Sequence, residues 1–297
     1  MHALPCARPA LITLPVVLLL LTGILPTRTV VGATLVNCYD AQREMVVRTR
    51  QEDCQGRAVS DAEAAAIRER RRSYVRDSLE VNSNPRVLGR RLERIGAGFF
   101  VDPAGHLLTN AHVVNNCTTI TVSRDRGEMA PARPIAVDSR ADLALLATDY
   151  RPERAAPFMP LDAPLPETVA IVGYPNQGLP PLRPLLTIGT IAPTRLITTP
   201  PRTLTLNADI RPGNSGGPVL ADDGRVVGVV FAAVDTPAVY EHTGRVVRNI
   251  GVSIPNTVTL PFLERHGIGI EETAPSTPPD DMLEYTHAFI ARVECWR

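Results

Sequence analysis

The sequence predicts an all-β fold built from short strands. Proline accounts for 28 of the 297 residues, whereas Phe, Trp and Tyr together make up only 4%. From about Gly96 onward, short apolar segments alternate with Gly, Pro and Asp, which is typical of strands joined by tight turns. This composition favours a β-rich chain with many turns over a helical bundle.

The most informative motif is Gly213-Asn214-Ser215-Gly216-Gly217-Pro218. The glycines after Ser215 leave its hydroxyl unshielded, and Gly213 lets the main chain turn sharply. The N–H groups of Gly213 and Ser215 can then point at one spot, where charge would develop on an attacked carbonyl oxygen. An ordinary glycine-rich turn is the alternative interpretation, and two further segments argue against it.

Each of these segments contains one ionisable side chain among mostly apolar residues. Leu108 to Val114 contains His112, and Ala141 to Leu146 contains Asp142. A serine hydroxyl needs a base to remove its proton, and the base needs a carboxylate that fixes its tautomer. The order His, Asp, Ser along the chain is that of chymotrypsin, not of subtilisin or the α/β-hydrolases.

The motifs TNAHVV, DLALL and GNSGGPV, preceded by GAGFFV and GHLL, resemble those of the trypsin-like serine peptidases, closest to the HtrA or Deg type. The resemblance covers roughly Arg94 to Pro261. It implies two six-stranded antiparallel β-barrels of the chymotrypsin fold, with a cleft between them. His112 and Asp142 would come from the first barrel and Ser215 from the second. HtrA proteases usually carry PDZ modules after the protease, and we expect none here.

Short strand-like segments can be assigned to both expected barrels. The first would contain Phe99 to Val101, Leu107 to Thr109, Thr118 to Ser123, Ile135 to Asp138 and Leu143 to Ala147. The second would contain Thr168 to Val172, Leu185 to Ile191, Thr203 to Asn207, Gly217 to Leu220, Arg225 to Ala233 and Gly251 to Ile254. The proline-rich stretch 151–166 reads as the crossing between the barrels.

The resemblance assigns the oxyanion hole to Gly213, Asn214 and Ser215. Digestive trypsin-like enzymes have an aspartate at the position of Asn214, which pairs with a freshly cut N-terminus. An amide cannot make that ion pair, so we expect no trypsinogen-type activation. Residues Val230, Phe231, Ala232 and Ala233 should form the strand edge that binds the substrate backbone.

Asp209 leaves the side-chain preference open. It lies six residues before Ser215, the spacing at which trypsins place the aspartate that binds Arg or Lys. HtrA proteases usually have a small apolar residue there and prefer aliphatic substrates. Ala233 and Gly251 would line the pocket and are small enough to admit a long side chain. Alternatively, Asp209 pairs with Arg211 or accepts N–H bonds of its own loop.

We expect four segments along the chain: a signal peptide at 1–33, an accessory segment at 34–90, the protease domain at 91–266, and a linker with a C-terminal element at 267–297. The first segment has a mostly apolar run from Ala10 to Leu25 and ends in small residues, as secretory signals do. A retained membrane anchor is the alternative, although the run is short for a span and contains Pro15.

The accessory segment is predicted to contain a hairpin and a helix. Ser60 to Glu63 matches a capping box, and Ala64 to Leu79 follows as the helix. Its arginines are either a contact surface for a membrane or partner, or an ordinary solvated helix face: Arg68, Arg70, Arg71, Arg72 and Arg76. The C-terminal residues Met282 to Arg297 remain undecided, because the resemblance implies a helix whereas Phe289 to Cys295 alternates like a strand.

Removing the signal peptide would leave four cysteines: Cys38, Cys54, Cys117 and Cys295. An even number in an exported chain predicts two disulfides, with three possible connectivities. We favour Cys38 with Cys54, because the stretch between them alternates like a hairpin, and Cys117 with Cys295 by elimination. No zinc-type spacing is present.

Together these features predict an exported serine endopeptidase, secreted or periplasmic, that acts on extended or unfolded polypeptides. Lys+Arg and Asp+Glu both number 31, which gives no support for a nucleic-acid partner. The chemistry implies no cofactor or metal, and we expect no stable membrane insertion after signal cleavage. Two alternatives remain: a non-catalytic binding protein on the same fold, and an esterase or processing enzyme with the same triad.

Overall fold

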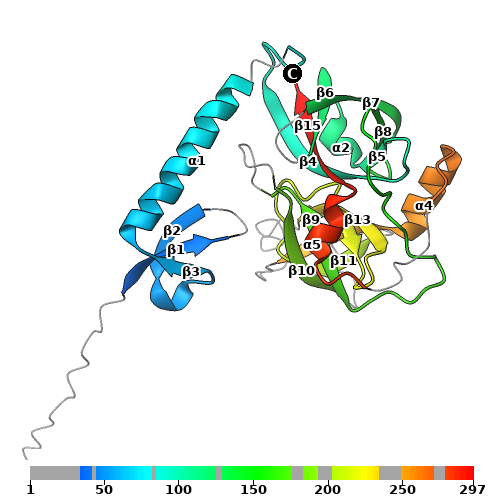
Figure 1. The fold of residues 1–297 in the computed structure, drawn as a ribbon. Helices are drawn as coiled ribbons and strands as arrows, with labels where there is room; N and C mark the ends of the chain where they lie inside the picture. Colours follow the sequence, from blue (N-terminus) through cyan, green and yellow to red (C-terminus); the bar gives the residue numbers. More distant parts are fainter. Residues whose placement is uncertain are drawn as a thin grey trace, which may run out of the picture.

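The computed structural model describes residues 34–41, 45–81, 85–124, 129–175, 183–192, 203–233, 249–270 and 278–297. The expected signal peptide lies outside these residues. Within them the dominant elements are two closed barrels of six antiparallel strands each (Figure 1). The chymotrypsin-like fold expected from the motifs is therefore confirmed.

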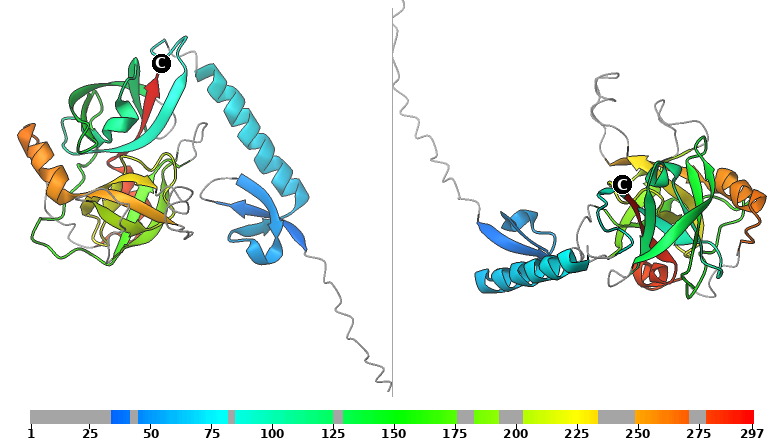
Figure 2. Two further views of the ribbon diagram at one scale, coloured as in Figure 1. Left: turned by 180° about the vertical axis from the view of Figure 1, so that it is seen from behind. Right: turned by 90° about the horizontal axis from the view of Figure 1, so that it is seen from above.

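The first barrel has the strand order β15-β4-β5-β8-β7-β6. Five of its strands follow one another in the sequence: β4 (Leu92–Phe100), β5 (His106–Thr109), β6 (Thr119–Ser123), β7 (Met129–Asp138) and β8 (Leu143–Thr148). The sixth, β15 (Ile290–Trp296), pairs with β4 on one side and β6 on the other. In Figures 1 and 2 this red strand lies beside the cyan β4. The barrel is thus closed by a strand from far down the chain.

Both interpretations of Met282 to Arg297 hold for part of that segment. A short helix, α5 (Met282–His287), comes first, and the side chain of Asp281 caps it by accepting the N–H groups of Leu283 and Glu284. The strand β15 then follows. Its Val293 packs in the barrel core, and the flanking residues Arg292 and Glu294, which point to the opposite face of the strand, are buried charged residues.

The second barrel has the order β10-β11-β14-β13-β12-β9. Its strands are β9 (Thr168–Gly173), β10 (Leu185–Ile191), β11 (Leu204–Asn207), β12 (Pro218–Leu220), β13 (Val226–Ala233) and β14 (Ile250–Pro255). The helix α4 (Asn256–Arg265) follows β14 directly. These strands lie where the sequence pattern placed them.

The expected crossing segment is hydrogen-bonded to both barrels. On one side the N–H of Ala156 donates to the carbonyl of Phe100 at 2.9 Å. On the other, the N–H of Met159 donates to the carbonyl of Val226 at 2.9 Å, and Asn256 Nδ2 donates to both Met159 and Val226 carbonyls at 2.9 and 2.8 Å. These bonds help to fix the barrels, and so the two halves of the cleft, relative to one another.

Residues 34–90 contain a small sheet and a helix. The sheet has the order β2-β1-β3, from β1 (Leu35–Asp40), β2 (Met45–Arg50) and β3 (Arg57–Val59), with the 3-10 turn Gln51–Asp53 between the last two. It packs against the start of α1 (Asp61–Val81). Ser60 Oγ accepts the N–H of Glu63 at 3.1 Å, as the capping box predicts. None of the described helices is both long enough and apolar enough to span a membrane.

Candidate active site

His112 lies on a four-residue helix, α2 (Ala111–Val114), that follows strand β5. The loop of Asp142 holds the start of this helix. The N–H of Ala111 and the side-chain amide of Asn110 both donate to the carbonyl of Asp142, at 3.2 and 3.0 Å. The helix carrying the imidazole and the turn carrying the carboxylate are therefore joined through the backbone as well as through their side chains.

The side chain of Asp142 binds His112 through both of its oxygens. Oδ2 lies 2.6 Å from Nδ1 of the ring, and Oδ1 accepts the backbone N–H of His112 at 2.8 Å. Asp142 has φ of 54°, the left-handed region that a non-glycine residue enters at a cost of about 1 kcal/mol or more. This paired geometry leaves Nε2 of His112 as the nitrogen that faces away from the carboxylate.

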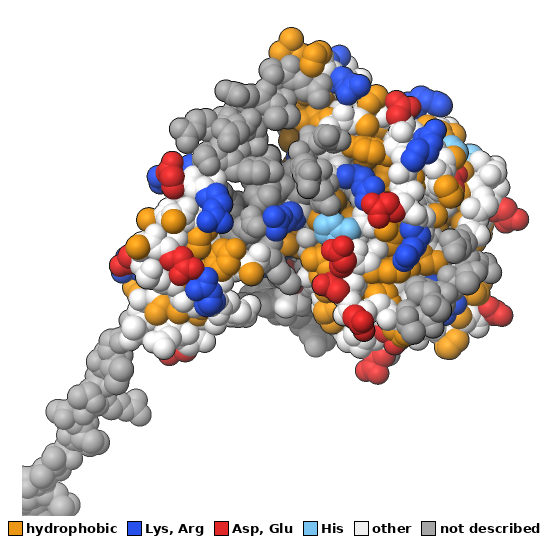
Figure 3. Space-filling view, viewed as in Figure 1, with side chains coloured by type: hydrophobic (Ala, Val, Ile, Leu, Met, Phe, Trp, Pro, Cys, Tyr) orange, Lys and Arg blue, Asp and Glu red, His pale blue; other side chains and the backbone are white. Residues whose placement is uncertain are grey.

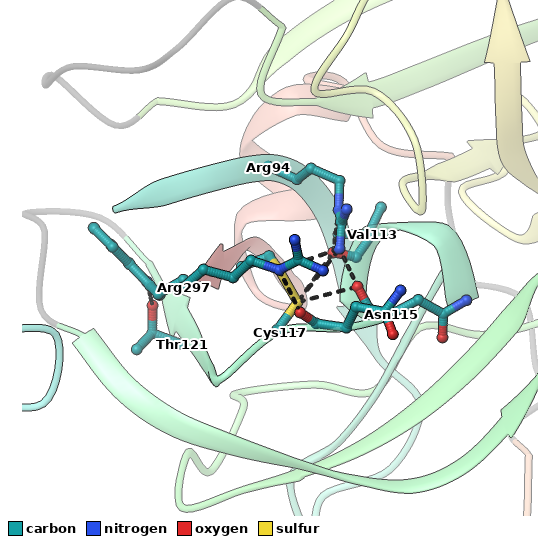
Figure 4. The surroundings of a disulfide bond; sticks show 9 residues. Arg94, Val113, Asn115, Cys117, Thr121 and Arg297 are labelled. Atoms are coloured by element: carbon teal, nitrogen blue, oxygen red, sulfur yellow. Dashed lines mark hydrogen bonds between the residues drawn. A yellow bond between two sulfur atoms is a disulfide. The ribbon is translucent and has the colours of Figure 1, made fainter. Parts of the chain in front are cut away.

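The other end of α2 is held by Arg94 of β4 (Figure 4). Its guanidinium donates to the carbonyls of Val113 and Asn115 and lies 3.3 Å from the sulfur of Cys295. A cation at a helix C-terminus is favourable because the last carbonyls are otherwise unpaired. Sequence reasoning missed Arg94, and no local pattern points to it.

The disulfide in Figure 4 joins Cys117, just after α2, to Cys295 on β15. The second disulfide joins Cys38 to Cys54 in the N-terminal segment. The favoured connectivity is therefore confirmed. The first bond places the chain that follows His112 directly against the strand that closes the barrel.

Ser215 lies in a loop shaped by two glycines in the left-handed region, Gly213 with φ of 102° and Gly216 with φ of 84°. A Cβ added to Gly213 would overlap the carbonyl oxygen of Tyr174, and Tyr174 N–H donates to the carbonyl of Gly213 at 3.0 Å. The carbonyl of Ser215 accepts the N–H of Ala97 at 2.8 Å. The serine loop of the second barrel is thereby bonded to strand β4 of the first.

The backbone amides of this loop differ in what they bind. Asn214 N–H donates to the carbonyl of Arg211 at 3.0 Å, so the expected contribution of Asn214 to the oxyanion hole is corrected: its amide is already used. Across the described residues, the amides of Gly213 and Ser215 have no acceptor. Two unpaired N–H groups next to Ser215 match the requirement of an oxyanion hole.

One cavity of about 1400 Å³ is lined by His112, Asp142 and Ser215 together. Within the described ranges, His112 and Ser215 are not hydrogen-bonded to each other. In catalytic sites without substrate such bonds are often long and tighten only when substrate binds. The ring of Phe231 packs edge-on against the imidazole, with centroids 6.3 Å apart.

The expected substrate edge is only partly available. Phe231, Ala232 and Ala233 line the cavity. Val230 does not: its side chain is fully buried, its N–H donates to Gly217, and its carbonyl accepts the N–H of Gly216. On the side of β13 that faces β12, the pairing therefore ends at Val230, and the free part of this edge starts at Phe231, while the other side stays paired with β14 through Ala233.

The two remaining pocket candidates lie outside the cavity lining. Asp209 Oδ2 accepts Nε–H of Arg211 at 2.9 Å. This ion pair is the alternative that the sequence offered to a pocket for basic side chains. Arg211 itself lines the cavity. A Cβ on Gly251 would meet the side chain of Ile210, so Ile210 fills the space beside that glycine. Of the two roles left open for Asp209, pairing with Arg211 is therefore the one that its contacts match.

Charged side chains of both signs surround a histidine on the face drawn in Figure 3. Among the described residues, no group of three or more His, Cys, Asp or Glu side chains could hold a metal ion. The groups that the site brings together are an imidazole, a carboxylate, a hydroxyl and two backbone amides.

The family model of the trypsin-like peptidase domain matches residues 96–229. Residues 96–229 are a trypsin-like peptidase domain. The match begins in β4 and ends in β13, so it contains the helix of His112, the turn of Asp142 and the loop of Ser215. The peptidase domain thus includes every residue expected to carry the chemistry.

Several curated proteins are similar to part of this chain. An uncharacterised protein of Sinorhizobium fredii, y4bJ, is 31% identical over 202 residues, covering 67% of this chain and 32% of that protein. A probable periplasmic serine endoprotease of the DegP-like type from Rickettsia conorii is 28% identical, covering 58% of this chain and 33% of its own. The serine protease Rv3671c of Mycobacterium tuberculosis is 33% identical over 159 residues, covering 50% and 40%.

This chain therefore spans between 32% and 40% of the length of these relatives. Among solved structures, the crystal structure of the inactive form of the Rv3671c protease matches with a TM-score of 0.47 and 25% identity, over 66% of this chain and 94% of that one.

Proposed function

We propose that this protein is an exported serine endopeptidase that cleaves extended or unfolded polypeptides. The observation that carries the proposal is the pair of hydrogen bonds between Asp142 and His112, one to the imidazole ring and one to the backbone N–H. Both residues line the cavity that Ser215 also lines. A carboxylate in this position keeps the proton on Nδ1 and leaves Nε2 as the base.

In this mechanism Ser215 attacks the scissile carbonyl carbon while His112 accepts its proton. The developing oxyanion is stabilised by the amides of Gly213 and Ser215. The imidazolium then protonates the leaving amine, which leaves an acyl-enzyme on Ser215. Water, activated by the same imidazole, releases the second product and restores the serine.

The free edge of β13 supports an extended substrate. From Phe231 to Ala233 its outer side has no strand partner among the described residues, because the pairing with β12 ends before it. A peptide added there as a strand would place its carbonyl over Ser215. Folded proteins rarely offer such a segment, so unfolded or extended chains are the favoured substrates.

The remaining parts of the chain have supporting roles in this proposal. Residues 1–33 would direct export as a signal peptide, to the periplasm or the exterior, in line with the two disulfides. Residues 34–90 would be an accessory segment outside the protease domain of residues 91–266. Residues 267–297 would contain a linker and the strand that completes the first barrel.

The proposal is tested with a fluorophosphonate probe, which reacts with an activated serine. We expect the protein to be labelled and to digest casein, and we expect Ser215→Ala to abolish both. Ser139 lines the same cavity but has no assigned role, so Ser139→Ala is the matched control and should keep labelling and digestion.

The two alternative functions give different results in the same assays. A binding protein on this fold would show neither labelling nor digestion. An esterase or specific processing enzyme would be labelled and would hydrolyse a small ester without digesting casein. Either outcome would reject general endopeptidase activity.

A further inference from the structure

Three arginines line the cavity of Ser215, and they come from three different elements. Arg211 lies just before the serine loop. Arg140 lies in the turn between β7 and β8, and Arg265 ends α4. Guanidinium groups present planar pairs of N–H donors that match a carboxylate. Their convergence on one cavity raises the question of what they bind.

The carboxylates that line the cavity are already occupied. Asp142 binds His112 through both oxygens. Asp138 Oδ1 accepts the N–H groups of Arg140 and Ala141 at 3.0 and 2.9 Å, and its Oδ2 lies 3.9 Å from Arg265. Each of these carboxylates therefore already has partners within the protein.

The guanidinium of Arg140 is a free cation at this wall. Across the described ranges it makes neither a hydrogen bond nor an ion pair, and only the backbone N–H of this residue is bonded. An exposed arginine is ordinary on a protein surface. Here, however, the side chain lines the cavity in which the substrate must lie.

Arg211 is held in place rather than free. Asp209 binds its Nε and one terminal nitrogen, and this ion pair raises the pKa of Arg211 above its usual value. Since Asp209 is not part of the cavity lining, the side chain that meets the substrate at this wall is the guanidinium, whose second terminal nitrogen remains available. The aspartate thus orients a cation instead of binding one from the substrate.

Apolar side chains complete the cavity: Phe231, Ile254, Val258 and Pro261. We propose that the peptidase selects polypeptides in which an acidic side chain lies next to an apolar one, on the amino-terminal side of the scissile bond. This inference rests on the proposed endopeptidase function and deepens it. The side of the bond follows from the direction of β13. A substrate strand that pairs antiparallel with β13 runs from Ala233 toward Phe231 and then reaches Ser215. The substrate residues next to Phe231, Ala232 and Ala233 therefore precede the bond that is cut.

The size of the effect follows from the exposure of the arginines. The side chains of Arg211 and Arg265 are 41% and 60% exposed, so water and salt weaken any ion pair that they form. We expect an acidic side chain in the preferred position to raise kcat/KM about 3-fold to 10-fold over its amide. The gain should shrink at high salt, where screening is strong.

The experiment uses matched peptides that place Asp, Asn or Lys at each of the positions preceding an apolar residue at the cut bond. We expect Asp to be preferred over Asn, and Lys to be poorest, at one or more positions. Arg140→Gln and Arg211→Gln, separately and together, should remove the preference for Asp over Asn, measured as the ratio of kcat/KM for the two peptides. Arg72→Gln removes the same charge from the exposed surface of α1 and should change nothing.

The outcomes separate this inference from the function on which it rests. Cleavage of all peptides without a preference for Asp, or a preference for Lys, would overturn the acidic selectivity and leave the endopeptidase intact. A preference for Asp that survives in the double variant would show that other groups bind the acid, and would overturn the role of these arginines. Absence of cleavage together with absence of fluorophosphonate labelling would instead reject the endopeptidase.

Discussion

At the scale of single residues, the site depends on backbone conformations that most side chains disfavour. Gly213 and Gly216 use the left-handed region, and both are surrounded so closely that a methyl group would overlap a neighbouring main-chain atom. Asp142 adopts the same region despite its side chain, which its hydrogen bonds to His112 compensate. The geometry of the site is therefore determined mainly by the conformation of the main chain.

Gly213→Ala tests this dependence. The added methyl group would overlap the carbonyl oxygen of Tyr174, so the loop must shift and the amide of residue 213 should move away from the oxyanion. We expect kcat to fall by about 10²-fold to 10³-fold, the usual loss on removing one oxyanion donor.

Gly267→Ala is the matched control, because Gly267 also has a positive φ, 73°, yet has open space around its Cβ position. Both variants carry the same intrinsic backbone penalty, but only the first disturbs the serine loop. Equal losses of kcat in the two variants would show that general strain, and not the position of the amide, explains the result.

At the scale of elements, strand β15 carries a buried ion pair into the first barrel. Arg292 and Glu294 are 4% and 1% exposed and lie 3.2 Å apart. Burial lowers the pKa of Arg292, and the neighbouring Glu294 opposes that shift. Glu294 also accepts hydrogen bonds from Thr121 and Ser123 of β6, at 2.5 and 3.2 Å. The carboxylate thus connects β15 to the adjacent strand through side chains as well as through the backbone ladder.

Glu294→Gln should be strongly destabilising, because it leaves the buried guanidinium of Arg292 without a counter-charge. We expect the free energy of unfolding to fall by about 3 to 5 kcal/mol, measured by urea denaturation. Glu284→Gln makes the same change at an exposed position of α5 and should alter it by less than about 0.5 kcal/mol. A small effect at Glu294 would mean that the pair contributes little to holding β15.

The same strand shows how far the sequence could predict the structure. The two barrels, with His112 and Asp142 on the first and Ser215 on the second, were implied by the family resemblance that the local motifs carry. The role of β15 was not predicted, because its partners β4 and β6 lie far away in the sequence. The alternation of apolar residues indicates a strand but does not show which strands it pairs with. The pairing of Asp209 with Arg211 was undecided for a similar reason: spacing gives the position of a side chain along the chain but not the direction in which it points.

At the scale of the whole molecule, the covalent link between Cys117 and Cys295 spans 178 residues, whereas that between Cys38 and Cys54 spans 16. A crosslink restricts the unfolded chain more when the loop it closes is longer. The long disulfide joins β15 of the first barrel to the chain just before β6, and the loop that it forms contains the whole second barrel. The short one affects only the small N-terminal sheet.

Replacing Cys117 and Cys295 together by serine should therefore lower the melting temperature of the barrels. The chain-entropy estimate is about 5 kcal/mol for this loop. Replacing Cys38 and Cys54 together should leave that transition in place, because their loop lies outside the barrels. Calorimetry of both double variants checks this, and equal shifts of the barrel transition would contradict the assignment of the two bonds to independent parts.

Because the strand that closes the first barrel is Ile290–Trp296, the histidine-bearing half of the molecule cannot be completed while the ribosome is still making the second barrel. The serine-bearing half, whose strands all lie before residue 256, can reach its final form earlier. All strands of the second barrel are thus synthesised before the last strand of the first barrel. In a growing chain, the barrel that holds Ser215 would therefore be complete before the barrel that holds His112, and the site proposed here would be assembled only after the last strand had been made.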